Sequence, residues 1–124
     1  MDTRIDYRPG DSDERPWGRW TVLATGDGYA IKEIEVDPGE ILSLQSHDHR
    51  AEHWVVLAGT ACVTVGNDET VCTAGETAYI PVGAKHRIAN TGDIPMRFIE
   101  LQTGAVLSED DHHRYDDRYG RNGE

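Results

Sequence analysis

The chain has 124 residues, 37% of them hydrophobic, and a formal net charge of −11 at pH 7. This length suits one compact domain and is too short for two ordinary ones. The negative charge argues against nucleic-acid binding, which requires a basic surface, and no stretch approaches the roughly 18 apolar residues of a membrane-spanning helix. We therefore expect one domain without a nucleic-acid or membrane partner.

The N-terminal segment is polar and acidic, with the sequence MDTRIDYRPGDSDERP. It lacks the apolar region of a secretory signal peptide, so the sequence predicts a cytoplasmic protein. We expect residues 1–14 to form a flexible arm and the ordered domain to begin at Arg15.

Short runs with alternating or β-branched character fill the middle of the chain. The predicted strands cover residues 19–24, 28–36, 40–45, 53–58, 60–65, 69–73, 77–80, 85–89 and 95–102. Turn signals such as Gly26-Asp27-Gly28 and Gly66-Asn67-Asp68 separate them. Many short strands at this spacing are typical of an antiparallel sandwich or barrel, which we expect to span residues 15–107.

The last segment, residues 108–124, is strongly polar and reads SEDDHHRYDDRYGRNGE. Such a composition is typical of a disordered tail. However, Tyr115 and Tyr119 are interleaved with Arg114, Arg118 and Arg121. Two interpretations follow from the composition: a disordered tail, or a segment that folds back on the barrel.

Four potential metal ligands lie in two blocks, residues 39–59 and 75–90. Gln45 and His47 are two residues apart, so on a strand they face the same side. Glu52 lies at the start of the next predicted strand, and His86 lies at the start of a later one. Neighbouring strands of a barrel could aim these side chains at one point. An amide oxygen, a carboxylate and two imidazoles suit one divalent ion of zinc, manganese, cobalt, iron or nickel.

His49 is the alternative to Gln45 as a ligand, because it shares the parity of His47. The chain must turn before Glu52, so we expect the strand to end near residue 47, which favours Gln45. Cys62 and Cys72 have no second sulfur at zinc-site spacing, and we expect free thiols there.

The two blocks resemble the two sequence motifs of the cupin superfamily. The matching residues are Gly39, Gln45, His47, Glu52 and Gly59 in the first block and Gly75, Pro81, Gly83, His86 and Asn90 in the second. Gln45 stands where the first motif usually has a histidine. The resemblance implies an all-β fold, a small cupin barrel of the double-stranded β-helix or jelly-roll type.

From Arg15 onward the chain also resembles the C-terminal cupin domain of type II mannose-6-phosphate isomerases. The matching strings include Arg15-Pro16-Trp17-Gly18, His49-Arg50-Ala51-Glu52-His53-Trp54 and Asp117-Arg118-Tyr119-Gly120-Arg121. The last string favours a segment 108–124 that packs on the barrel. Asp48 departs from the family, which usually has a histidine there. We expect a stand-alone domain, without the guanylyltransferase domain that precedes this cupin in the family.

The resemblance implies a metal-dependent isomerase that interconverts mannose 6-phosphate and fructose 6-phosphate through an enediol. One metal ion, for which we expect zinc, would polarise a sugar oxygen, and His49 or Lys85 would move the proton. Arg50, Arg114 and Arg121 would bind the phosphate of the sugar. For the quaternary structure we expect a homodimer.

Two other classes of function stay open from the sequence. One is a different metal-dependent cupin enzyme, such as a dioxygenase or another sugar-phosphate isomerase or epimerase. The other is a non-catalytic cupin that senses a sugar or a metal. A fold does not fix a function. Gln45 favours the isomerase over a dioxygenase, which typically has more histidine ligands, and Arg114 and Arg121 disfavour a pure metal sensor.

Overall fold

A computed structural model describes residues 3–116 and 118. These residues form strands and connecting turns without a helix, which confirms the all-β prediction. The strands are β1 (Arg4–Ile5), β2 (Ser12–Arg15), β3 (Gly18–Gly26), β4 (Tyr29–Val36), β5 (Leu44–Ser46), β6 (Arg50–Ala58), β7 (Ala61–Val65), β8 (Asp68–Cys72), β9 (Thr77–Ile80), β10 (His86–Asn90), β11 (Met96–Gly104), β12 (Val106–Leu107) and β13 (His113–Asp116). In this part of the chain no helix is long and apolar enough to span a membrane.

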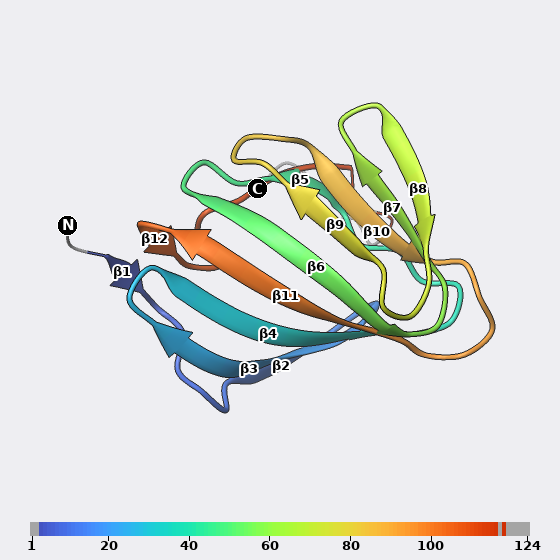
Figure 1. Cartoon of the computed structure of the whole chain (residues 1–124), viewed down its shortest axis with the longest axis horizontal. Coiled ribbons are helices and arrows are strands. Elements are labelled where there is room, and N and C mark those ends of the chain that lie inside the picture. The colour runs from blue at the N-terminus through green and yellow to red at the C-terminus, as the bar shows by residue number, and fades with distance from the viewer. Residues whose placement is uncertain (1–2, 117, 119–124) are drawn as a thin grey trace.

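Two sheets enclose the interior of the barrel (Figure 1). One has the strand order β2-β3-β4-β11-β6-β9, and the other has the order β13-β5-β10-β7-β8. A short parallel pair, β1 with β12, completes the described strands. Along β4 and β11 buried residues alternate with partly exposed ones, as expected for strands with one face toward a core.

The interior of the six-stranded sheet changes from apolar to polar along its strands. On β11 the inward residues are Met96 and Phe98, followed by Glu100 and Gln102. Phe98 is aligned with Ile34 of β4, whereas Glu100 is aligned with Lys32. One end of the barrel therefore holds a packed apolar core, and the other end holds buried charged and polar side chains.

Gly59, the last glycine of the first motif block, lies at a position where only glycine fits. Its φ is +85°, in the left-handed region, and a Cβ added there would lie 2.9 Å from the Cα of Met96. A side chain would therefore be both strained and sterically excluded. The turn between β6 and β7 requires glycine for this reason.

In the N-terminal segment, which the sequence predicts to be a flexible arm, the structure has paired strands from residue 4 onward. β1 pairs with β12, and β2, which ends at Arg15, pairs with β3 at the edge of the six-stranded sheet. Tyr7 is buried and packs with Val22, Ala30 and Leu107 in a second, smaller core. Its local composition is polar, so only these long-range contacts reveal that the segment is ordered.

The C-terminal segment lies against the five-stranded sheet as far as the structure describes it. β13 pairs with β5, where Arg114 is aligned with Gln45. The Tyr115 hydroxyl and the Ser46 hydroxyl are 2.8 Å apart, at hydrogen-bond distance. Residues 108–116 are thereby placed next to the first of the two motif blocks.

Candidate metal centre

His47, Glu52 and His86 come together at the polar end of the barrel. All three are buried, and one potential ligand atom from each lies within 4.8 Å of the others. His47 directly follows β5, Glu52 lies within β6, and His86 opens β10. The pairing of His86 with Gln45 across β10 and β5 fixes this arrangement. Three of the four residues that the sequence predicted as ligands therefore lie close together.

Both histidines are oriented by hydrogen bonds from Nδ1 to backbone carbonyls. His47 Nδ1 lies 2.6 Å from the carbonyl oxygen of Asp111, and His86 Nδ1 lies 3.0 Å from that of Ala84. A carbonyl only accepts, so Nδ1 donates in each case. In the neutral form Nε2 then carries the lone pair and is the potential ligand atom, an arrangement typical of metal-binding histidines.

Glu52 is held as a carboxylate by its neighbours. Trp54 Nε1 donates to Oε1 at 2.8 Å, and Arg50 Nε donates to Oε2 at 2.9 Å. Burial acts to raise the pKa of Glu52, but the charge of Arg50 holds this pKa well below its usual value. Burial also lowers the pKa of His86, which favours its neutral form. These are the protonation states in which the two side chains bind a metal.

Two acceptor atoms face each other in this site. His47 Nε2 lies 3.2 Å from Glu52 Oε2, and the guanidinium of Arg50 lies beside both atoms, with Nη2 at 3.3 Å from His47 Nε2. Two lone pairs at this separation need a proton or a cation beside them, and the Arg50 guanidinium supplies that charge here. The nitrogen and oxygen donor set by itself fits a divalent ion such as zinc, without identifying the metal.

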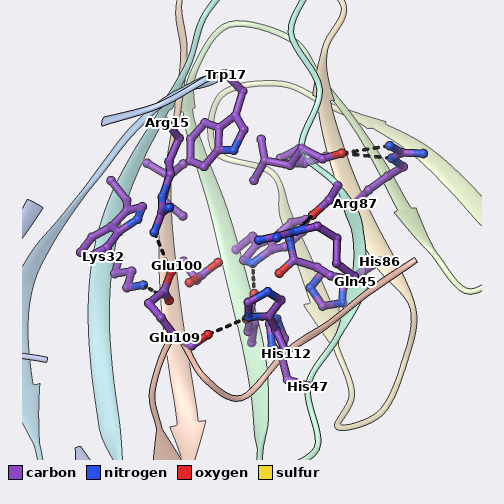
Figure 2. Close-up of a pocket in the computed structure, with 18 of the residues that line it drawn as sticks. Arg15, Trp17, Lys32, Gln45, His47, His86, Arg87, Glu100, Glu109 and His112 are labelled. Atoms are coloured by element: carbon purple, nitrogen blue, oxygen red, sulfur yellow. Dashed lines mark hydrogen bonds and ion pairs between the residues drawn. The ribbon is translucent and has the colours of Figure 1, made fainter. Parts of the chain in front are cut away.

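Gln45 lies next to His86 at the same end of the cavity (Figure 2). Its Nε2 donates to Ser43 Oγ at 3.2 Å, so the amide oxygen is the end that is left for a metal. The rival ligand, His49, is exposed and is not among the residues that line the cavity. The structure thus places Gln45, and not His49, with the three ligands.

A cavity of about 240 Å³ opens beside the candidate metal site. Four basic side chains line it together with the three candidate metal ligands. They are Arg15, Lys32, Arg87 and Arg114. Figure 2 shows Arg15 and Lys32 reaching toward Glu109, with Gln45, His47 and His86 grouped on the other side. Arg50 completes the lining as the buried partner of Glu52.

Lys32 and Arg15 were not predicted from the sequence as functional residues. Lys32 Nζ lies 3.0 Å from Glu109 Oε2 and about 4 Å from the ring centres of Tyr7 and Trp20, at 4.1 and 4.2 Å. Arg15 Nη2 lies 3.6 Å from Glu109 Oε1. One signal was present: Lys32 shares the parity of Ile34, which marks it as inward-facing. Glu109 comes from the tail, and no local pattern points to it.

Of the other predicted site residues, some line the cavity and others lie outside it. His49 and Lys85 are exposed and do not line the cavity, and Lys85 Nζ lies 4.3 Å from the ring centre of Tyr115. Arg50 is buried and Arg114 lines the cavity. Arg121 lies outside the described residues. Neither proposed base therefore faces the cavity.

Glu100 is a buried acid next to Glu52. Burial and the charge of Glu52 raise the pKa of Glu100 to about 8. It accepts a hydrogen bond of 2.8 Å from Gln102 Nε2, while Gln102 Oε1 has no hydrogen-bond partner within the described part of the chain. Glu100 therefore keeps its proton at neutral pH, which avoids two adjacent buried carboxylates.

The raised pKa of Glu100 predicts a pH-dependent stability. Between pH 4.5 and about 8 the folded chain holds this proton and the unfolded chain does not, so this contribution to the free energy of unfolding falls as pH rises through that window. Glu100→Gln mimics the protonated acid and should flatten the profile. Urea unfolding from pH 5 to pH 8 with a chelator measures this. Glu33→Gln, at a partly exposed position, is the control and should leave the profile unchanged. Parallel profiles for the wild type and Glu100→Gln would contradict the prediction.

Comparison with known proteins identifies the family of the chain. Residues 6–117 match the family described as Mannose-6-phosphate isomerase C-terminal. The chain belongs to this family. The match covers β2 to β13 and so includes all the residues of the candidate metal centre.

Curated relatives are much longer than this chain. The mannose-1-phosphate guanylyltransferase of Escherichia coli K12 is 49% identical over 120 residues, which is 97% of this chain and 25% of that protein. The alginate biosynthesis protein AlgA of Pseudomonas aeruginosa is 47% identical over 110 residues, 89% of this chain and 23% of that protein. The chain thus spans about a quarter of the length of the relatives that it matches.

These relatives correct the predicted function. They are named for mannose-1-phosphate guanylyltransferase and for polysaccharide biosynthesis, and not for an isomerase. The prediction of an isomerase that interconverts mannose 6-phosphate and fructose 6-phosphate is therefore wrong. What the findings show is an isomerase-like cupin domain of this enzyme family. The prediction failed because it carried an activity over from a resemblance to one domain of a longer enzyme, and the likeness of one domain does not fix an activity.

Solved structures confirm the cupin fold. The chain is similar to a cupin domain of Cnp3 from Schizosaccharomyces pombe, with a TM-score of 0.67 and 18% identity over 69% of this chain and 64% of that chain. It is also similar to oxalate decarboxylase OxdC of Bacillus subtilis, with a TM-score of 0.74 and 21% identity over 85% of this chain and 30% of that chain. At these identities the likeness concerns the fold alone.

Proposed function

We propose that this chain is a metal-dependent binding domain for a mannose phosphate. The names of its relatives contain mannose 1-phosphate as the molecule acted on, and that sugar phosphate is the ligand we assign to the cavity. In this proposal the domain binds and orients the ligand, and a divalent ion takes part in binding it.

The observation that carries the proposal is the charge of the cavity. Five basic and three acidic side chains line it in the described part of the chain, although the whole chain has a net charge of −11. One of the three acids, Glu100, has a pKa raised to about 8 and is neutral at pH 7. A divalent ion at His47, Glu52 and His86 would add further positive charge. Such a site favours an anionic ligand.

The size of the cavity favours a small anion. Its volume of about 240 Å³ lies below the roughly 300–1,000 Å³ that is typical of pockets for drug-sized ligands. A hexose phosphate is a compact molecule, whereas a nucleotide sugar carries a base and a second sugar in addition. We therefore assign the cavity to a sugar phosphate and not to a nucleotide sugar.

The chain's own residues divide into two groups around such a ligand. Arg114 lines the cavity from β13 of the five-stranded sheet, and its guanidinium can bind two phosphate oxygens at once. Arg87 on β10 also lines the cavity, with its guanidinium bonded to the Leu42 carbonyl and to Asp116. Gln45, His47, Glu52 and His86 lie at the inner end and would hold the metal. A bound divalent ion supplies a Lewis acid for a sugar oxygen.

Titration calorimetry with the purified chain tests this function. Zinc or manganese should bind with one ion per chain, and mannose 1-phosphate should then bind at least about tenfold more tightly than to the chelator-treated chain. Mannose, which lacks the phosphate, and GDP-mannose serve as ligand controls and should bind weakly. A folded, metal-loaded chain that does not bind mannose 1-phosphate would contradict the proposal.

A further inference from the structure

We propose that Asp111 is a positioning residue of the metal centre, which makes the C-terminal segment part of the site. The inference deepens the proposed function, because it rests on metal binding by His47. Asp111 lies outside both motif blocks and 64 residues from His47. No local pattern in the sequence connects the two residues.

Asp111 holds the loop that carries His47 by both its backbone and its side chain. Its carbonyl oxygen accepts from His47 Nδ1 at 2.6 Å. Its carboxylate accepts the backbone N–H of Asp48 at 2.9 Å with one oxygen and that of His49 at 3.0 Å with the other. The three bonds converge on consecutive residues between β5 and β6. Asp111 therefore sets both the orientation of the imidazole and the path of the backbone that bears it.

Asp111 is in turn fixed on both sides, so it is a firm anchor for the loop. Asp111 is only 8% exposed, and its backbone N–H donates to the carbonyl oxygen of Ser108 at 3.2 Å. Ser108 is itself buried, and its carbonyl also accepts from Arg50 Nη1 at 3.2 Å. After Asp111, His113 pairs with Ser46 at the start of β13. The segment is therefore bonded to the barrel on both sides of Asp111.

The bond to the carbonyl also selects the ligand atom. With Nδ1–H directed at Asp111, the lone pair of neutral His47 lies on Nε2, which is 3.2 Å from Glu52 Oε2. Loss of this bond lets the opposite tautomer compete, with its lone pair directed away from Glu52. Outer partners of metal-binding histidines typically contribute about 10–100-fold to metal affinity, which is the size of effect we expect here.

Zinc affinity, measured by competition with a chromophoric chelator, tests this role in the full chain. Asp111→Ala should bind zinc about 10–100-fold more weakly than the wild type. Asp111→Asn keeps the size of the side chain and one acceptor, so it should be folded and show a smaller loss. Asp110→Ala is the matched control, because the Asp110 side chain is 88% exposed, and its affinity should stay within twofold.

The tautomer of His47 provides a readout that a purely structural role would not change. Nitrogen-edited NMR of the zinc-free protein should show that the Nδ1–H form predominates in the wild type. Asp111→Ala keeps the carbonyl that accepts from Nδ1 but loses the two carboxylate bonds that hold the loop, so its Nδ1–H fraction should fall, with a smaller change in Asp111→Asn. Variants that retain both the Nδ1–H form and wild-type zinc affinity would overturn the role of Asp111 alone. A folded wild type that does not bind zinc would instead overturn the metal site of the proposed function and this inference with it.

Discussion

His86→Ala is expected to abolish binding of one divalent ion per chain. His86 is a buried ligand with Nδ1 bonded to a carbonyl and Nε2 available to the metal. Its removal leaves His47 and Glu52 as the remaining members of the triad, and two strong donors do not complete a zinc site. The apparent affinity should fall by more than about 100-fold, beyond the loss typical of outer partners. Metal analysis after dialysis, together with calorimetry, measures this.

His53→Ala is the matched control for this experiment. His53 lies one residue from Glu52 but is exposed on the outer face of β6, where its ring packs 4.6 Å from that of Tyr79. Its removal should leave metal affinity unchanged. If His86→Ala folds and still binds one ion with wild-type affinity, the metal site is somewhere else and the triad has another role.

Arg50→Met is expected to cause the largest loss of stability among the cavity residues. Arg50 is 5% exposed. It donates to Glu52, to the Ser108 carbonyl and, at 3.4 Å, to the Tyr7 hydroxyl. Its removal leaves the Glu52 carboxylate buried without its main cation. Breaking a buried ion pair in this way typically costs about 3–5 kcal/mol of unfolding free energy. Urea unfolding with a chelator present measures the change.

Arg97→Met is the control for the effect of losing an ion pair as such. Arg97 Nη1 lies 3.6 Å from Glu33 Oε2, and both side chains are substantially exposed, at 43% and 37%. A surface pair of this kind contributes less than about 1 kcal/mol. Equal losses in Arg50→Met and Arg97→Met would show that the buried network does not stabilise this barrel.

The fold was predictable because its signals are local. Alternation of inward and outward residues and turn residues such as Gly66-Asn67-Asp68 located most of the strands, including β7 and β8. Differences arise around residues 40–50, where β5 is reduced to Leu44–Ser46 and β6 begins at Arg50, and at the two ends of the described chain, where β1, β2, β12 and β13 were not predicted. Register there is set by pairing with β10, β11 and β13, and such contacts are absent from a local pattern.

The candidate ligands were predictable by the same reasoning, but the residues that contact and orient them were not. Gln45, His47 and His86 have the parity and motif positions that bring them together. Asp111, Glu109 and Lys32 act through contacts that span 64 and 77 residues of sequence. A polar tail such as residues 108–116 has a composition typical of disorder, although its described part anchors the loop that bears His47.

Anomalous X-ray scattering from a zinc-loaded crystal tests most directly whether the cavity is a metal centre. We expect an anomalous peak at the zinc edge within about 2.0–2.2 Å of Nε2 of His47 and His86 and of a carboxylate oxygen of Glu52. We also expect the amide oxygen of Gln45 as the fourth protein ligand. Zinc bound at another position, with no peak between these three side chains, would contradict this expectation.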